Sequence, residues 1–477
     1  MSKETIRRAY LLGVLATILA FNGANNLTFG IALQGIKGEF SLSDTQLGLL
    51  TGIAFALFYT LTGVPISRWA DRGDRVALVA ITTILWCGAV ILCALAQNFA
   101  QLLLIRVCVA VGEAGCFPAG LSLIADYFSR AERPRAVAVY LQGGSVGIVL
   151  GYFLGGWSNQ LYAWRWTFVL LGLPGLALAA LAWLTLQEPR RLGKTTLEIG
   201  TAGESRVAAE RPDSPVSAPP GLGEICATLW NSRTFRQLTF FYTVSSFFSG
   251  AIAQWQPSFL VRTYALGTGE LGTWMAVIYG SGLMAGTYLS GEWATRRAAN
   301  NERLQFRAVA VAFSCLGVFA ALAYLAANRY WAFGWLELWS VAAAMTSAPL
   351  FATIQTLAPA RMRATAFTFI QLFANLIGLG LGPLMVGALS DALRPWVGAE
   401  SLRDALLLMC PGYLWGGWHL WRASKTVMRD LEAAQTDNEC RRDHRGLARI
   451  HDRAGSCPTE PCFDARGNKS VCGQQRL

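Results

Sequence analysis

The chain has 477 residues, of which 53% are hydrophobic and only 14% are charged, and its mean hydropathy is +0.38. Soluble domains carry about 25% charged residues, so the composition excludes an ordinary soluble protein and indicates a chain solvated mostly by lipid. The formal net charge is +11, but the Lys and Arg residues lie in short loops between apolar segments, so we expect no nucleic-acid-binding surface.

Twelve apolar segments follow one another along the chain, and each is long enough to span a bilayer as a helix. They fall near residues 9–32, 46–66, 76–96, 99–123, 136–159, 165–186, 235–259, 270–291, 306–327, 333–357, 364–389 and 402–421. Lys and Arg concentrate in the loops on one side, so the positive-inside rule predicts that both termini are cytoplasmic. The first segment lacks a convincing signal cleavage site, and we interpret it as an uncleaved helix.

The first segment contains the run FNGANN, which places three amide side chains inside an apolar helix: Asn22, Asn25 and Asn26. Amides both donate and accept hydrogen bonds. These three residues are therefore candidate substrate-binding groups.

The loop after the second segment reads SRWADRGDR, from residue 67 to 75. Here Asp71 can accept hydrogen bonds from a neighbouring helix N-terminus, and Arg72 and Arg75 can pair with carboxylates. We therefore predict a conformational latch made of Asp71, Arg72 and Arg75. The alternative is a charged cytoplasmic turn with no further role.

The fourth segment carries two charges, Arg106 and Glu113, within RVCVAVGEAGCFPAG. A charge near the bilayer centre costs at least about 2.5 kcal/mol on insertion scales, so each should face protein or water. A spacing of seven residues separates them by about 10.5 Å along one helix face, too far for a direct pair. We interpret Glu113 as a proton-coupling group, and Arg106 as a residue that neutralises it or holds an anionic headgroup. The alternative is a buried ion network that only locks helices together.

The fifth segment repeats glycine at every fourth position, at Gly143, Gly147, Gly151 and Gly155. These positions share one helix face and let another helix approach closely, as in small-xxx-small packing. We expect a helix-packing role for them and no ligand contact.

Residues 187–234 interrupt the apolar segments and are rich in Pro, Gly, Ser and charge, so they read as a linker between six segments and six. The two halves echo each other weakly, because GEWATRR (291–297) matches SRWADRGDR at the Trp, Ala and Arg positions. Such a parallel repeat is typical of transporters whose substrate site lies between the halves near the bilayer midplane. Further polar residues inside segments extend the candidate substrate site: Gln142, Gln254, Tyr279, Gln371 and Asn375.

Motifs of enzyme chemistry are lacking, since the three His residues and the candidate nucleophiles form no recognisable triad. Four of the eleven Cys residues lie in the polar tail at 433–477, without the paired C-x-x-C spacing of a zinc site. We therefore expect no enzyme activity, no metal site and no cofactor, and we expect the tail to be disordered.

SRWADRGDR and the six-plus-six repeat resemble the major facilitator superfamily. Within it, RVCVAVGEAGCFPAGLSLIADYF, YAWRWTFVLLGLPG (162–175) and QWQPSFLVRTYAL (254–266) are similar to the Spinster-like family, and this resemblance covers residues 9–432. It implies a secondary transporter with lipid-like or otherwise amphipathic substrates. The family usually carries an Asp-Arg pair where this chain has Asn25 and Asn26. Asn cannot titrate, so either Glu113 carries proton coupling alone or transport is uncoupled.

The sequence thus predicts an all-α membrane protein with twelve transmembrane helices in two pseudo-symmetric six-helix bundles, residues 1–186 and 235–432. We expect a secondary active transporter of the bacterial plasma membrane, a monomer that moves an amphipathic lipid or hydrophobic organic molecule by alternating access. Its partners would be this substrate, membrane lipids and, where transport is coupled, protons. Two alternatives stay open: an organic-anion/proton symporter that uses Arg106, and a receptor or scaffold that has lost transport.

Overall fold

The computed structural model describes residues 3–129, 132–189, 230, 232–298, 301–346 and 370–430, and within these ranges the chain forms helices and turns with no strand. The N-terminal half contains α1 (Lys3–Phe40), α2 (Asp44–Thr51), α3 (Ile53–Arg72), α4 (Arg75–Cys93), α5 (Phe99–Tyr127) and α6 (Arg133–Thr185). The C-terminal half contains α9 (Arg233–Tyr264), α10 (Thr268–Arg297), α11 (Glu302–Leu325), α12 (Arg329–Met345), η1 (Ala374–Leu379), α15 (Gly380–Val397), η2 (Gly398–Glu400), α16 (Ser401–Met409) and α17 (Gly412–Ala423).

Seven of the described segments are long and apolar enough to cross a membrane, and two of these, 135–185 and 370–423, exceed 50 residues. α6 corresponds to two predicted segments, 136–159 and 165–186, and the backbone kinks between them at Ala163, where φ is 63° and ψ is 170°. The predicted segments 333–357 and 364–389 extend into residues 347–369, which lie outside the described part of the chain. The all-helical fold is confirmed, and the count of twelve spans stays a prediction. The linker lies almost entirely, and the tail wholly, outside the described residues.

Helix starts follow local capping signals in the sequence. Ser43 and Gln46 form a reciprocal capping box at the start of α2, which satisfies backbone N–H groups that have no partner within the helix. Asp74 accepts from the backbone N–H of Ala77 at 2.9 Å and begins α4, and Asn98 accepts from Gln101 at 2.9 Å and begins α5. These caps fix the short turns that let successive helices run antiparallel.

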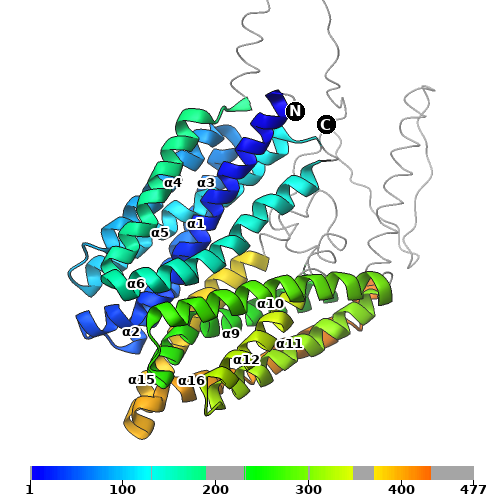
Figure 1. The fold of residues 1–477 in the computed structure, drawn as a ribbon. Helices are drawn as coiled ribbons and strands as arrows, with labels where there is room; N and C mark the ends of the chain where they lie inside the picture. The colour runs from blue at the N-terminus through cyan, green and yellow to red at the C-terminus, as the bar shows by residue number, and fades with distance from the viewer. Residues whose placement is uncertain are drawn as a thin grey trace, which may run out of the picture.

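The two halves meet at one end of the molecule and diverge toward the other, as Figure 1 shows. The closed end, as we name it, carries the turns at 41–43, 94–98, 265–267 and 326–328; the N-terminal end carries Lys3 and the turn at 73–74. At the closed end α2 packs on α15 and α6 packs on α10. Glycine permits this approach, since a Cβ on Gly52 would overlap the carbonyl oxygen of Gly380.

The four-residue glycine repeat of α6 faces α1, which belongs to the same half. A Cβ at Gly143 would overlap the carbonyl oxygen of Ala16, and one at Gly147 would overlap that of Ala20. Gly151 and Gly155 lie against the next two turns of α1 in the same way. The repeat thus holds α1, with its three Asn residues, close to α6.

We expect Gly147→Ala to destabilise the protein by about 1–3 kcal/mol, because the new methyl group has no space against the α1 backbone. Gly144→Ala is the matched control on the same helix, because within the described ranges its Cβ position has a single neighbour, a Leu19 methyl group at 4.0 Å. Alanine favours a helix over glycine by about 1 kcal/mol, so the control should be neutral or stabilising. Melting temperatures in detergent test the pair, and equal effects of the two substitutions would contradict the packing account.

Candidate functional site

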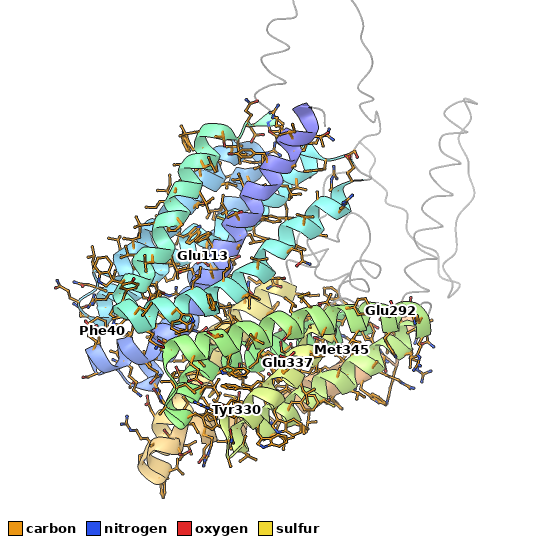
Figure 2. The ribbon with its side chains drawn as sticks, viewed as in Figure 1. Phe40, Glu113, Glu292, Tyr330, Glu337 and Met345 are labelled. Carbon is orange, nitrogen blue, oxygen red and sulfur yellow. The ribbon has the colours of Figure 1, made fainter. Side chains whose placement is uncertain are left out.

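Glu113 lies inside the N-terminal half, where its carboxylate accepts hydrogen bonds from two amides of α1. Asn25 Nδ2 donates to Oε1 at 2.9 Å and Asn26 Nδ2 donates to Oε2 at 2.8 Å. Glu113 and Asn25 are 3% and 1% exposed, and Asn22 adds a further side-chain interaction with the carboxylate. Figure 2 shows Glu113 midway along this half. The structure therefore brings together four of the polar residues singled out in the sequence.

This amide cage suits both protonation states of the carboxyl group. A carboxylate only accepts hydrogen bonds, whereas the neutral acid must also donate one. Asn25 Oδ1 is buried and has no hydrogen-bond partner within the described ranges. The assignment of O and N in an amide rests on the hydrogen-bond network, and rotation of the Asn25 amide turns Oδ1 toward Glu113 as the acceptor that the acid needs.

Arg106 lies on the same helix, α5, and no ion pair joins it to Glu113 among the described residues. Its guanidinium carbon lies 4.1 Å from the ring centroid of Phe29 and 5.0 Å from that of Phe55, a cation–π arrangement that stabilises a desolvated cation by about 2 kcal/mol. Arg106 is 3% exposed, and its Nε has no hydrogen-bond partner within the described ranges. Arg106 therefore interacts with Glu113 only at long range.

Among the described residues, none of the other predicted substrate residues forms a hydrogen bond with Glu113. Tyr279 of α10 donates to Gln256 of α9 at 2.7 Å and stacks on Tyr152 of α6 with ring centroids 5.1 Å apart, so it joins the two halves. Gln371, just before the π-helical turn η1, donates to Asn375 inside that turn at 2.8 Å. Gln254 lies against Gly30 of α1, and Gln142 is exposed on α6.

Of the predicted latch residues, only the side chain of Arg75 is described; those of Asp71 and Arg72 lie outside the described set. Arg75 is fully buried and pairs with Glu188 and, at 2.6 Å, with Asp126. These partners all belong to the N-terminal half, so Arg75 ties α4 to α5 and to the residues after α6. A latch between the halves stays a prediction.

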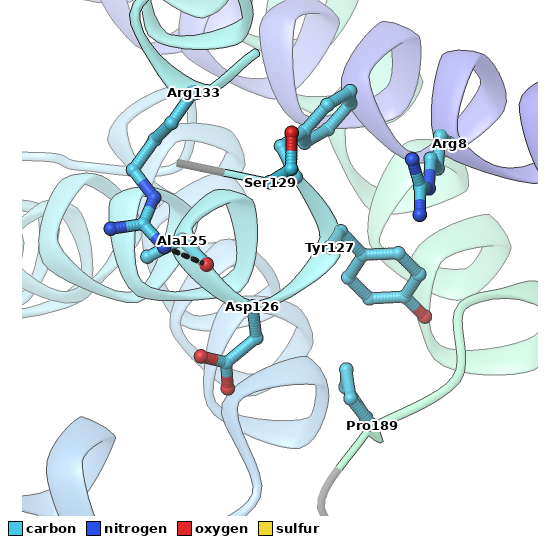
Figure 3. Close-up of a pocket in the computed structure, with 8 residues that line it drawn as sticks. Arg8, Ala125, Asp126, Tyr127, Ser129, Arg133 and Pro189 are labelled. Atoms are coloured by element: carbon cyan, nitrogen blue, oxygen red, sulfur yellow. Dashed lines mark hydrogen bonds between the residues drawn. The ribbon is translucent and has the colours of Figure 1, made fainter. Parts of the chain in front are cut away.

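A pocket of about 550 Å³ lies at the N-terminal end beside this network (Figure 3). Arg133 donates to the carbonyl oxygen of Ala125 there at 2.6 Å. The Ser129 hydroxyl next to it donates to Glu132 at 2.8 Å. This hydrogen bond and the positive charge of Arg8 lower the pKa of Glu132. The pocket lies about 20 Å along α5 from Glu113, judged from the rise per residue, so it is separate from the cage.

Asp44, which the sequence reasoning missed, is the centre of an ionic contact between the two halves at the closed end. Arg262 of α9 donates to both of its carboxylate oxygens, at 2.8 and 2.6 Å. Lys37 donates at 2.5 Å and Ser390 of α15 at 2.7 Å. The Asp44 side chain is 3% exposed, so these bonds are largely shielded from water.

Asp391 of α15 makes a second contact across the same boundary by capping α2. Its carboxylate accepts from the backbone N–H of Asp44 at 3.1 Å, and from the backbone N–H and hydroxyl of Thr45 at 2.7 and 2.6 Å. A carboxylate at a helix N-terminus is stabilised by the helix dipole. We name Lys37, Asp44, Thr45, Arg262, Ser390 and Asp391 the closed-end network. Lys37 and Arg262 could have pointed to this network from the sequence. Both are cations in the last turn of a helix, on the side of the membrane that has few basic residues, and such cations need carboxylate partners.

Comparisons with known proteins agree with this architecture. Residues 13–383 match the family model of the Major Facilitator Superfamily. The MFS-type efflux pump of Mycolicibacterium smegmatis is 30% identical over 432 residues, which cover 89% of this chain and 95% of that protein. The Arabidopsis thaliana protein named "Probable sphingolipid transporter spinster homolog 1" is 21% identical over 424 residues, or 84% of each chain.

A solved structure gives the same result at the level of the fold. A bacterial homolog of the human lysosomal transporter Spinster, solved in an inward-facing and unoccupied conformation, matches with a TM-score of 0.73 and 27% sequence identity. The match covers 90% of this chain and 99% of that one. Family match, sequence relatives and fold together show that the chain belongs to the major facilitator superfamily and is a Spinster-like membrane transporter within it.

Proposed function

We propose that this protein is a secondary active transporter that moves an amphipathic lipid or hydrophobic organic molecule by alternating access, coupled to protons through Glu113. The observation that carries the proposal is the amide cage, a carboxyl group inside a membrane helix held by Asn25 and Asn26. Ionisable groups within membrane spans usually serve transport or proton relay, because their insertion is costly.

Alternating access requires one end to close while the other is open, and the packing supports this cycle. The closed-end network and the Gly52–Gly380 approach join the halves at one end. We propose that the closed end faces outward and that the N-terminal end, with both termini, faces the cytoplasm, as the distribution of Lys and Arg predicts. The solved Spinster homolog is likewise inward-facing.

Proton exchange at Glu113 takes place within this framework. With the carboxylate charged, both amides donate to it. With the acid neutral, Oδ1 of the rotated Asn25 amide accepts a hydrogen bond from the O–H of the acid. Both protonation states of Glu113 therefore have hydrogen-bond partners in α1 although α1 offers no titratable partner. The site can thus work without the Asp that the family usually carries in this helix. Arg106, held between Phe29 and Phe55, provides the fixed positive charge that makes the carboxylate tolerable. The two bundles, 1–186 and 235–432, move against each other around this site, with residues 187–234 as their linker.

The substrate class follows from the family and from the sparse charge of the spans. One relative is named a sphingolipid transporter and another an efflux pump, and an amphipathic or hydrophobic cargo fits both names. Arg106 supports a second candidate, the organic-anion/proton symporter, because its Nε, which has no partner within the described ranges, is a donor for a carboxylate.

Ligand-induced stabilisation of the purified protein separates these two candidates. A compound that binds the folded state raises its melting temperature, by the equivalent of about 2.7 kcal/mol at a concentration one hundred times its Kd. We expect sphingoid bases or lysophospholipids to raise the melting temperature by different amounts at two pH values. In Glu113→Gln the stabilisation should be the same at both pH values. Stabilisation by small carboxylates alone, lost in Arg106→Gln, would replace the proposal with the anion symporter.

A further inference from the structure

A second carboxyl group lies inside a predicted membrane span of the C-terminal half, residues 333–357, and the sequence reasoning did not single it out. Glu337 is in α12, eight residues after Arg329, so it lies about 12 Å along the helix from the closed end. The hydrocarbon core of a bilayer is about 30 Å thick. The predicted span therefore places Glu337 within the apolar layer, at a depth where an unpaired charge is costly.

The neighbour of Glu337 on the adjacent helix is Ser281 of α10, whose hydroxyl lies 3.0 Å from both carboxylate oxygens. The same hydroxyl also lies 2.6 Å from the carbonyl oxygen of Val277. A hydroxyl has one proton, so it cannot donate to all three oxygens at once. Within the described ranges no basic side chain forms an ion pair with Glu337. An ionised Glu337 thus receives at most one hydrogen bond from the part of the chain that the structure describes.

Glu337 and Ser281 face away from the interior of the protein. Tyr279 marks the inner side of α10, because it bonds Gln256 of α9 and stacks on Tyr152 of α6. Two residues advance a helix by 200°, so Ser281 points to the opposite side. The exposed residues of that side are apolar or aromatic: Val277 (53%), Met284 (77%) and Tyr288 (69%) on α10 and Leu338 (46%) on α12. We name these four residues with Ser281 and Glu337 the Glu337 face.

We propose that the Glu337 face binds a single-chain amphiphile through its primary ammonium group, with the ammonium on Glu337 and the alkyl chain along the apolar residues of α10. Charge complementarity selects this occupant. A cation neutralises the carboxylate with charge-assisted hydrogen bonds that Ser281 alone does not supply, and a saturated chain covers the adjacent apolar surface. A neutral or anionic headgroup leaves the carboxylate uncompensated. The inference rests on the proposed transport of amphiphiles and assigns it a second, membrane-facing recognition site.

The test compares dodecylamine with dodecanol and dodecanoate, which share the chain and differ in the headgroup. Binding to the intact protein in uncharged maltoside micelles is measured by thermal stabilisation. We expect dodecylamine to bind roughly tenfold more tightly than dodecanol, the equivalent of one charge-assisted contact, and this preference to vanish in Glu337→Gln. Glu270→Gln is the matched control, since Glu270 pairs with Arg329 at the ends of the same two helices and should leave the preference unchanged.

Two further readouts keep the result interpretable. Ser281→Ala should weaken the preference only in part, and it covers the case in which Glu337→Gln fails to fold. A diazirine analogue of dodecylamine should label peptides of α10 and α12 in the wild type. An equal amine preference in wild type and Glu337→Gln, or labelling elsewhere, would overturn the site while leaving the proposed function intact. A preference that needs Glu337, in a protein that moves no amphiphile across liposomes, would instead overturn the proposed function alone.

Discussion

Glu113→Gln is expected to abolish substrate accumulation driven by a pH gradient while leaving substrate exchange between the two sides of the membrane. Gln keeps the shape of the protonated acid and cannot release a proton. Its amide can donate to the rotated Asn25 Oδ1, which is buried and has no other partner among the described residues, so the cage should hold the variant without loss of folding. The site would then be fixed in its neutral state, and the carrier would equilibrate its substrate without concentrating it.

The size of the effect follows from the energy in the gradient. One pH unit corresponds to 1.36 kcal/mol per proton, so a wild-type carrier that moves one proton per substrate should reach up to about tenfold accumulation. Glu113→Gln should give a ratio near one, with tracer exchange within about a factor of two of the wild type. Reconstituted liposomes with a one-unit gradient of either orientation measure both quantities. Undiminished accumulation in the variant would remove Glu113 from the coupling role, and loss of exchange together with accumulation would favour a structural role.

Asp44→Asn is expected to open the closed end. The substitution leaves Arg262 and Lys37 without the carboxylate that both contact. Removing one partner of a buried ion pair costs about 3–5 kcal/mol, and the side chains of Arg262 and Lys37 are about a fifth exposed, which favours the lower end of this range. A loss of about 3 kcal/mol shifts the ratio of closed to open conformers roughly a hundredfold.

Spin labels report this shift as a distance. One label on Gly38→Cys, where a side chain meets open space, and one on Ala399→Cys place a probe on each half at the closed end, in a background without native cysteines. Asp44→Asn should broaden the distance distribution toward longer values. Glu39→Gln is the matched control, because Glu39 pairs with Arg165 of its own half at the same end and should leave the distribution unchanged. If Asp44→Asn also leaves the distances unchanged, the closed-end network does not hold the halves together.

Much of the fold could be predicted from the sequence, because a membrane span is determined by local composition. The predicted family and the all-helical fold are confirmed, and helix ends such as those of α4 and α5 lie within a few residues of the predictions. The positions of the helices could therefore be predicted from the sequence, whereas the contacts between helices required the structure. Periodicity showed that Gly143 and Gly147 share a face, but the partner helix, α1, depends on tertiary packing.

The site was predicted unevenly, for physical reasons that differ between residues. Glu113 is conspicuous in the sequence because it is a charge in an apolar run. Buried polar groups need hydrogen-bond partners, and Glu113 finds them in the amides of Asn25 and Asn26. Asp44 was missed because it follows a turn, where a carboxylate is ordinary, and its partner Arg262 lies 218 residues away. Glu337 has the same signal as Glu113, a single acid within a span, and closer attention to residues 333–357 could have found it.

The most direct test of the account is whether substrate movement and proton movement are one process. The measurement is the pH of the lumen of liposomes that contain the protein, followed with a trapped dye while a bound amphiphile is added outside under zero initial gradient. Coupling through Glu113 predicts a change of lumenal pH that tracks substrate flux in the wild type and is absent in Glu113→Gln. Substrate flux with no change of pH in the wild type, or an equal change in Glu113→Gln, would contradict it.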